Sequence, residues 1–369
     1  MDDYLIQNAS SIDSPALVIY PERIVHNIRT MLAMVDGEAD KLIPHVKTHK
    51  MAEVAKMQVE AGITKFKCAT IAEAEMLADT GARHVLLAYQ LTGPKIQRFG
   101  ELVQAYNWVE WASLIDNWVS AEELAAGFEK TAYKPVVYID VNLGMNRTGH
   151  AVDAGLEAFY RELKADERFD LRGFHAYDGH LRDPDVAVRQ RQADEALKPL
   201  EDFADRLEQE GEPRPVIIVG GTPTFTNHAR RPNVWCSPGT CLLWDWGYSD
   251  GLPEQHFEWA ALLITRVISK PAPGLITTDL GHKAVAAENP LNKRIRFLNL
   301  SGYEVVGQSE EHMVLQVADW NNIRIGEVLY GVPYHICPTV ALHDEAQVIL
   351  NGEVVERWAI DARKRRITY

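Results

Sequence analysis

The sequence is poor in cysteine and in positive charge, and no apolar run in it reaches membrane-spanning length. With 38 basic and 52 acidic residues, its formal net charge of -14 argues against nucleic acid or an anionic membrane as a partner. The N-terminus lacks the basic and apolar regions of a signal peptide, so we expect a cytoplasmic protein. The cysteines form no CxxC pair and predict no disulfide framework: Cys68, Cys236, Cys241 and Cys337.

Short apolar runs alternate with helical patterns through most of the chain. They lie at residues 42–47, 65–70, 84–89, 111–116, 135–142, 171–177, 216–221 and 234–240. Eight units of a strand followed by a helix are the number that a (β/α)8 barrel requires. We therefore predict an α/β fold with a TIM-type barrel over residues 21–248. Helix starts are predicted at the capping patterns Thr70 to Glu73, Ser120 to Glu123 and Asp183-Pro184.

The pattern changes after Tyr248. From Phe257 onward the apolar runs are β-like and separated by turn residues, including the hairpin signal Asn351-Gly352. We predict strands at residues 262–268, 274–279, 313–316, 328–329, 347–350 and 354–358. We therefore expect a C-terminal antiparallel β-domain over residues 249–369. A closed barrel of eight has no place for another strand, so the run at residues 12–20 is expected to join this second domain.

The most informative stretch is the basic cluster Pro44-His45-Val46-Lys47-Thr48-His49-Lys50. It follows the first predicted barrel strand, and barrel enzymes build their sites at the carboxyl ends of strands. A lysine held there among other cations has a lowered pKa and attacks aldehydes. The alternative is a solvated loop in which charges cluster by chance.

Glycine-rich turns end the last two predicted strands, at Gly220-Gly221-Thr222 and Gly239-Thr240. Barrels commonly hold a phosphate at these strands, on backbone N–H groups and hydroxyls. Plain glycine-threonine turns are the alternative. A nucleophilic lysine together with a phosphate cradle points to pyridoxal phosphate, whose aldehyde needs an amine.

Six segments together resemble the D-threonine aldolase and D-serine dehydratase family, whose barrel is of the alanine racemase type. They are SPALVIYPERIVHNI, IPHVKTHK, NLGMNRTG, VGGTPT, SPGT and PYHICPTVALHD, and they span about Ser14 to Asp344. The resemblance implies a barrel followed by a C-terminal β-domain and a homodimer.

The resemblance also implies roles for individual residues. Lys47 matches the Schiff-base lysine, with His45 as a framing neighbour, and Arg147 matches an arginine on the phenolic oxygen of the cofactor. Tyr177 matches a residue near the pyridine nitrogen. The phosphate cradle is matched by Gly221, Thr222, Gly239 and Thr240.

A second constellation is His335-Ile336-Cys337. In an extended segment, side chains two residues apart project to the same side. The imidazole of His335 and the thiolate of Cys337 could therefore coordinate one cation. A buried histidine and cysteine without metal are the alternative. In the family this pair binds a divalent metal, and sulfur with imidazole favours zinc over manganese or magnesium.

The implied activity is a lyase on D-β-hydroxy amino acids. We expect a D-threonine aldolase, which cleaves its substrate to glycine and an aldehyde. D-serine or D-threo-3-hydroxyaspartate dehydratase is the alternative, because Cys337 is typical of the dehydratases. A racemase or a non-catalytic pyridoxal phosphate carrier would leave the His335 and Cys337 pair without a role.

The group that acts on the β-hydroxyl is less well indicated. Aldolases of this family carry a histidine directly after the tyrosine and another a few residues later. In this sequence Asp178 and Asp183 stand at those positions and His180 lies between them. We therefore expect His180 and Asp183 to be the catalytic candidates beside Lys47.

Overall fold

The fold is described from a computed structural model of residues 2–131 and 133–369. The chain forms two compact units, each assembled from separate stretches of sequence. The barrel unit contains Met31–Lys47, Ala52–Gly239 and Lys364–Tyr369, and the sheet unit contains residues 2–30, Thr48–Met51 and Thr240–Arg363. Helix α1 (Pro21–Met34) begins in the sheet unit and ends in the barrel unit.

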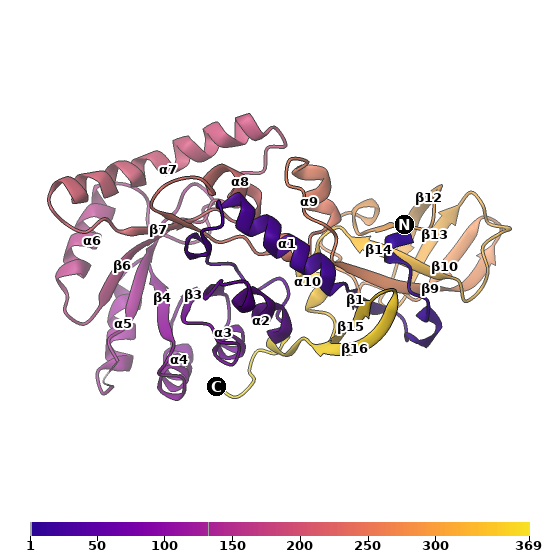
Figure 1. The fold of residues 1–369 in the computed structure, drawn as a ribbon, viewed down its shortest axis with the longest axis horizontal. Helices are drawn as coiled ribbons and strands as arrows, with labels where there is room; N and C mark the ends of the chain where they lie inside the picture. Colours follow the sequence, from indigo (N-terminus) through magenta and orange to yellow (C-terminus); the bar gives the residue numbers. More distant parts are fainter. Residues whose placement is uncertain (1, 132) are drawn as a thin grey trace. The chain divides into compact units, whose positions relative to one another are not determined.

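The barrel unit is built on a parallel sheet of seven strands in chain order. These strands are β2 (Lys65–Cys68), β3 (His84–Gln90), β4 (Glu110–Ile115), β5 (Val136–Asp140), β6 (Asp170–His175), β7 (Val216–Val219) and β8 (Val234–Cys236). The connecting helices are α2 (Ala52–Glu60), α3 (Ile71–Ala78), α4 (Pro94–Ala105), α5 (Trp118–Phe128), α6 (Ala154–Ala165), α7 (Val186–Gln209) and α8 (Phe225–His228). Figure 1 shows α4, α5 and α6 outside the strands, as expected when each strand is followed by a helix that returns along the outer surface.

The segment predicted as the first barrel strand joins the two ends of this sheet. Leu42 bridges Cys236 of β8 and His45 bridges Lys67 of β2, both in parallel register. The segment forms isolated bridges rather than a regular strand because Pro44 has no N–H to donate to a ladder. Its position still confirms the predicted TIM-type barrel.

Apolar packing holds the closing segment in place. Ile43 is fully buried in a cluster to which β3, β4, β5 and β7 also contribute. Removing such a buried side chain by mutation to alanine costs about 2–5 kcal/mol. The segment that precedes Lys47 is therefore anchored in the barrel core.

One predicted helix start is confirmed. The Thr70 hydroxyl accepts a hydrogen bond from the Glu73 N–H at 3.1 Å, and the Glu73 carboxylate accepts one from the Ala69 N–H at 2.6 Å. These bonds satisfy donors that the first turn of α3 leaves without helical partners.

Two other predicted helix starts are wrong by a few residues. Helix α5 is capped by Asn117, whose side chain accepts from the Ser120 N–H, so Ser120 lies inside the first turn. Helix α7 is capped by Asp185 rather than by Asp183. In both cases a neighbouring Asn or Asp in extended backbone reaches the free N–H groups.

The sheet unit contains nine strands. These are β1 (Ala16–Ile19), β9 (Ala261–Ala272), β10 (Leu275–Thr278), β11 (Ile295–Phe297), β12 (Tyr303–Gln308), β13 (Met313–Val317), β14 (Val328–Pro333), β15 (Glu345–Leu350) and β16 (Glu353–Ala359), and its short helices are α9 (Trp246–Gly251) and α10 (Ile336–Val340). All strand pairs are antiparallel except β1 with β15. The sequence prediction missed β11 and β12, which are short or only partly buried.

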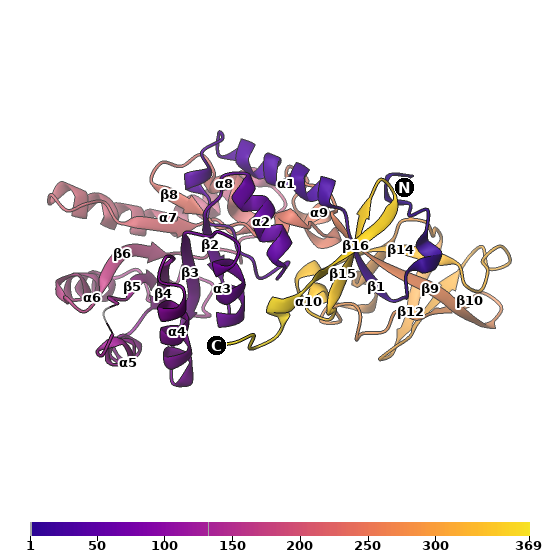
Figure 2. The ribbon, with the colours of Figure 1, turned by 60° about the horizontal axis from the view of Figure 1, so that its bottom comes forward.

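Strand β1 lies inside the sheet unit, paired with β9 on one side and β15 on the other. Figure 2 shows the β15–β16 hairpin next to β1. Val18 of β1 packs in one buried cluster with Leu262 of β9 and Ile349 of β15. The N-terminal strand therefore contributes to the core of this unit.

In the described part of the chain, no helix combines the length and apolar character needed to cross a bilayer.

Candidate active site

The barrel unit contains a cavity of about 420 Å³ at the carboxyl ends of its strands. Its lining brings together four residues singled out in the sequence: His45, Lys47, Arg147 and Tyr177. Its remaining lining residues are Lys67, Ala69, Ala88, Tyr89, Gln90, Thr148 and His175.

Lys47 is held at the cavity by the residue two positions before it. The Lys47 N–H donates to Nδ1 of His45 at 3.2 Å, which closes a tight turn at the end of the barrel segment. His45 is buried, whereas Lys47 is half-buried, so its amine can meet a ligand. The next residue pair repeats the arrangement, since the Met51 N–H donates to Nδ1 of His49 at 3.1 Å.

Arg147 lies on a tight loop that glycine makes possible. Gly149 has a φ of 102°, and a Cβ there would lie 2.7 Å from the backbone nitrogen of Asn142. The Asn142 side chain accepts hydrogen bonds from the N–H groups of Gly144 and Asn146. This loop presents the exposed Arg147 side chain to the cavity.

The Tyr177 ring lies among three cationic side chains. Its centroid is 5.7 Å from Nζ of Lys47, 5.4 Å from Nζ of Lys67 and 5.2 Å from Cζ of Arg147. Three cations at one aromatic ring repel one another, so this cavity favours an anionic ligand.

The two glycine turns approach the cavity residues closely. A Cβ on Gly221 would lie 2.7 Å from Cε2 of Tyr177, and one on Gly239 would lie 2.5 Å from the carbonyl oxygen of His45. The Gly239 N–H donates to the Thr222 hydroxyl at 3.1 Å, which ties the two turns together. Thr240 belongs to the sheet unit, where its hydroxyl lies 3.3 Å from the sulfur of Cys337.

Lys67 was not identified from the sequence as a site residue, yet it is the most buried cation of the cavity. Its side chain is 2% exposed, and Nζ donates to the Ser237 hydroxyl at 2.5 Å. Burial and the charge of Lys47 lower the pKa of Lys67 to about 7, although Asp140 acts in the opposite direction. A lysine inside a strand of a parallel sheet, which is normally apolar, is the signal that could have revealed it.

A chain of polar contacts connects Lys67 to neighbouring strand ends. Nζ of Lys67 lies 3.3 Å from Nε2 of His175, and Nδ1 of His175 lies 2.7 Å from the Asp140 carboxylate. Gln90 donates to the carboxylates of Asp140 and Asp116 at 2.9 and 3.0 Å. Burial and the charge of Lys67 lower the pKa of His175, so this imidazole is neutral.

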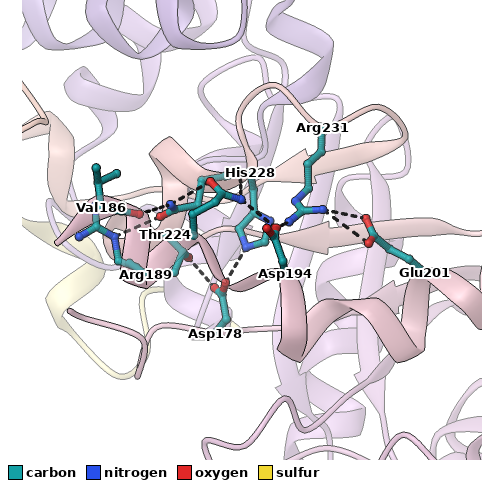
Figure 3. A network of polar contacts seen from close by, with 10 residues as sticks. Asp178, Val186, Arg189, Asp194, Glu201, Thr224, His228 and Arg231 are labelled. Carbon is teal, nitrogen blue, oxygen red and sulfur yellow. Dashed lines mark hydrogen bonds and ion pairs between the residues drawn. The ribbon is translucent and has the colours of Figure 1, made fainter. Parts of the chain in front are cut away.

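Asp178, which follows Tyr177, is not among the described residues that line the cavity and belongs to a buried network (Figure 3). It is 1% exposed, and its carboxylate accepts from the Thr224 hydroxyl at 2.6 Å and contacts Nε2 of His228 at 2.7 Å. Burial alone would raise the pKa of Asp178, but His228 and Thr224 keep it below the ordinary value. These two contacts of Asp178 connect the turn at Tyr177 to the turn that follows Gly221.

The two expected acid–base candidates lie outside the cavity lining formed by residues of the described chain. His180 is exposed, and its Nε2 would be 3.3 Å from a Cβ on Gly144 in the Arg147 loop. Asp183 accepts a hydrogen bond from the Asp185 N–H at 3.0 Å, just before α7. The structure brings His180 to the Arg147 loop but does not bring Asp183 to the cavity.

His335 and Cys337 form a polar pair at the start of α10. Burial alone would lower the pKa of His335, but its bond to Cys337 and its contact with Glu288 raise that pKa to about 9. Burial would raise the pKa of Cys337, yet His335, Thr240 and Thr48 lower it below its ordinary value. These shifts favour the imidazolium form of His335 and the thiolate form of Cys337.

Glu288 is a third member of this cluster that sequence analysis missed. Its carboxylate lies 2.6 Å from Nδ1 of His335. A carboxylate on one imidazole nitrogen is the usual companion of a histidine that binds metal through the other nitrogen. Within residues 2–131 and 133–369, no three His, Cys, Asp or Glu side chains form a complete metal-binding group. The donors of His335 and Cys337 fit zinc with open coordination positions.

The cavity residues also fit pyridoxal phosphate. An accessible amine, a guanidinium and two closely approached glycine turns supply partners for its aldehyde, its phenolic oxygen and its phosphate. Side chains at Gly221 and Gly239 would occupy space beside Tyr177 and His45.

Two family models match the chain. The model described as alanine racemase, N-terminal domain, matches residues 19–245, and a serine dehydratase domain model matches residues 260–349. A D-threonine aldolase from Arthrobacter sp is 26% identical over 361 residues, which cover 95% of this chain and 93% of the relative.

Solved structures share the fold of the whole chain. A D-threonine aldolase from Filomicrobium marinum superposes with a TM-score of 0.85 at 24% identity, covering 96% of both chains. A cysteine-to-alanine mutant of a D-threo-3-hydroxyaspartate dehydratase in its metal-free form gives a TM-score of 0.80 at 24% identity, covering 95% of this chain and 97% of that one.

Proposed function

This chain belongs to the alanine racemase N-terminal domain family, and from that membership we propose a pyridoxal phosphate-dependent lyase that acts on D-β-hydroxy amino acids. Its relatives include both aldolases and a dehydratase. We propose D-threonine aldolase activity, with cleavage of the Cα–Cβ bond to glycine and an aldehyde. The observation that carries the proposal is the cavity that joins the half-buried Lys47 to Arg147 beside two glycine turns.

The proposed roles of the cavity residues follow from their chemistry. Lys47 supplies the amine that binds the cofactor aldehyde, and His45 holds the backbone of Lys47 in position. Arg147 supplies a permanent charge for the phenolic oxygen, while the turns of Gly221, Thr222, Gly239 and Thr240 hold the phosphate. When bound, pyridoxal phosphate accepts the electron pair that bond cleavage leaves at Cα.

We propose that His335 and Cys337 hold a divalent metal, with Glu288 orienting the imidazole. Zinc suits a thiolate and an imidazole best, with manganese or magnesium as alternatives. A bound metal supplies Lewis-acid polarisation of a hydroxyl oxygen, which suits a β-hydroxyl substrate. His180 is our candidate for proton transfer at that hydroxyl, because it is exposed beside the Arg147 loop. The hydrogen bond from Asp185 to Asp183 makes Asp183 the weaker candidate.

A dehydratase is the second candidate, and the thiolate of Cys337 favours it. One related dehydratase structure is a cysteine-to-alanine mutant in the metal-free form. In this case D-serine or D-threo-3-hydroxyaspartate would lose its Cα proton and its β-hydroxide, and hydrolysis of the resulting imine by water would release ammonia and leave a 2-oxo acid. A racemase or a non-catalytic carrier would give His335, Cys337 and Glu288 no chemical task.

For the assembly we propose a homodimer in the cytoplasm. The dimer follows from the family resemblance, and the four free cysteines suit a reducing compartment. Residues 21–248 and 249–369 are the proposed cofactor-binding and metal-binding regions, with residues 12–20 assigned to the second.

Substrate incubation tests the proposal. The holoenzyme is incubated separately with D-threonine, D-serine and D-threo-3-hydroxyaspartate, and glycine with aldehyde is assayed against ammonia with 2-oxo acid. Glycine and acetaldehyde from D-threonine, abolished by EDTA and restored by zinc, would support the aldolase. Ammonia with a 2-oxo acid would establish the dehydratase instead, and racemised substrate without cleavage would overturn both lyases. L-Threonine and the Lys47→Ala variant are the controls.

A further inference from the structure

Lys67 is a buried cation to which the proposed lyase assigns no role. It lines the same cavity as Lys47 and Arg147. The side chain of Lys67 is 2% exposed, whereas Lys47 is half-buried and Arg147 is exposed. Lys67 therefore lies deepest of the three cations, at the floor of the cavity.

Two acceptors hold the Lys67 amine in place. Its Nζ donates to the Ser237 hydroxyl at 2.5 Å and lies 3.3 Å from Nε2 of His175. The Asp140 carboxylate lies 2.7 Å from Nδ1 of His175, which places the imidazole proton on Nδ1. Nε2 of His175 therefore has a lone pair for the Lys67 ammonium.

When its amine is protonated, Lys67 has a third donor available to a ligand. An ammonium has three N–H groups, and in residues 2–131 and 133–369 its hydrogen bonds engage Ser237 and His175. A buried charged donor without an acceptor is costly, so a ligand acceptor at the cavity floor would be stabilising.

The acceptor atom that meets the third donor of Lys67 can be identified by elimination among the acceptors of pyridoxal phosphate. In the proposed function Lys47 binds the aldehyde, Arg147 binds the phenolic oxygen and the glycine turns bind the phosphate. The ring nitrogen is the remaining acceptor, and Tyr177, which the resemblance places near that nitrogen, has its ring centroid 5.4 Å from Nζ of Lys67. It lies opposite the carbon that bears the aldehyde, so it points to the cavity floor when the aldehyde meets the shallower Lys47. A substrate joins at the aldehyde end, away from Lys67.

We propose that Lys67 is a cofactor-contacting residue whose ammonium donates its third N–H to the ring nitrogen of bound pyridoxal phosphate. This inference rests on the proposed function, because it requires that cofactor in the cavity. The Tyr177 ring, 5.4 Å from Nζ of Lys67, covers the same region. A cation at the ring nitrogen keeps the nitrogen unprotonated, and a neutral ring withdraws less charge from Cα than a protonated one. Lys67 thereby sets how strongly the cofactor stabilises charge at the reacting carbon.

Binding of a cofactor analogue tests the contact without measuring turnover. The dissociation constants of pyridoxal phosphate and of its 1-deaza analogue, which has C–H in place of the ring nitrogen, are measured on the apoprotein. Wild type should prefer pyridoxal phosphate by about tenfold or more, the worth of a charge-assisted hydrogen bond. Lys67→Met should lose this preference, while Lys67→Arg keeps part of it. Lys56→Met, which removes an exposed lysine on α2, should behave as wild type.

The outcomes separate this inference from the proposed function. Equal preference in wild type and Lys67→Met would overturn the role of Lys67 and leave the lyase proposal standing; this result is also expected if Lys67 binds the substrate carboxylate. No saturable binding of pyridoxal phosphate to wild type would overturn both.

A second measurement needs no mutation and covers the case in which Lys67→Met does not fold. Pyridoxal phosphate labelled with ¹⁵N in its ring is bound to wild type, and the nitrogen chemical shift is recorded. The shift of an unprotonated, hydrogen-bonded nitrogen is expected. The shift of a protonated ring nitrogen would contradict the inference.

Discussion

The hydroxyl oxygen of Thr48 lies 3.2 Å from the sulfur of Cys337. Thr240 places a second hydroxyl 3.3 Å from the same sulfur, and both threonines are buried. Thr48 directly follows Lys47 in the chain. The residue after the proposed cofactor amine therefore supports the proposed metal ligand.

Replacing Thr48 by valine should weaken metal binding. Valine keeps the volume but removes the hydroxyl beside Cys337, and loss of an outer hydrogen bond to a ligand typically costs tenfold or more in metal affinity. Zinc affinity is measured by competition with a chelator. Thr48→Ser retains the hydroxyl and should restore most of the affinity; if serine and valine behave alike, the hydroxyl does not matter.

Glu288→Gln should lower zinc affinity by roughly tenfold, because the carboxylate on Nδ1 of His335 makes the other ring nitrogen a better ligand. The same chelator competition measures the change. Glu304→Gln is the matched control, since Glu304 is exposed on β12 of the same unit. Equal affinity in the two variants would show that Glu288 has no part in metal binding.

Lys47→Ala should abolish the absorbance band that the bound cofactor shows near the edge of the visible spectrum. That band requires a covalent link between the cofactor aldehyde and an amine. The cavity holds a second amine, so the variant also tests which lysine forms the link. Borohydride reduction followed by peptide mass spectrometry should find the label on Lys47 in wild type. A persistent band in Lys47→Ala with the label on Lys67 would reverse the assignment.

The stability of the apoprotein should depend on pH through Lys67. Its pKa is lowered from 10.5 to about 7 in the fold by burial, then by Lys47 and Arg147, and Asp140 and Asp178 only partly offset this. The unfolded chain binds more protons than the fold between those values, so stability rises with pH there, by at most about 1.4 kcal/mol per pH unit. The destabilisation caused by the lowered pKa of Lys67 is fully present below pH 7.

Chemical unfolding of wild type and Lys67→Met at several pH values measures this contribution. The free energy of unfolding of wild type minus that of the variant should increase from pH 7 toward 10. A difference that stays flat over this window would mean that Lys67 titrates normally. Lys56→Met again provides the exposed control.

Asp178→Asn should destabilise the barrel unit by about 3 kcal/mol, because it removes a buried carboxylate that is hydrogen-bonded to Thr224 and His228. His228 and Thr224 hold the pKa of Asp178 below its ordinary value despite burial. This contribution is present above pH of about 4, the unfolded pKa, and is lost as the pH falls through the lower folded pKa. Wild type and variant should therefore converge in stability on acidification, whereas Glu167→Gln on the exposed surface should show no such effect.

The barrel was predictable from the sequence because its strands are short apolar runs with polar ends. The run before Lys47 was located correctly, although Pro44 reduces its ladder to isolated bridges. Strand β11 was missed because it has only three residues, and β12 was missed because apolar and polar residues do not alternate cleanly along it. Local patterns therefore identified the longer apolar strands and missed a strand that is very short and one that is only partly buried.

The site was predictable where a motif marks it and not where the fold assembles it. Lys47, Arg147 and Tyr177 stand in motifs, and the structure gathers them at one cavity. Lys67 and Glu288 stand in no motif, since their partners His175 and His335 lie 108 and 47 residues away in the chain. Asp178 resembled a base by position, yet its side chain turns inward to His228.

The way the two units share the chain has a consequence for dissecting the protein. The chain crosses between them five times, at residues 30/31, 47/48, 51/52, 239/240 and 363/364. No single cut separates them, and β1 is needed between β9 and β15. A fragment of residues 249–369 would lack β1 and leave apolar edges exposed to aggregation. We expect the intact chain to unfold as one cooperative body, without a separately soluble C-terminal domain.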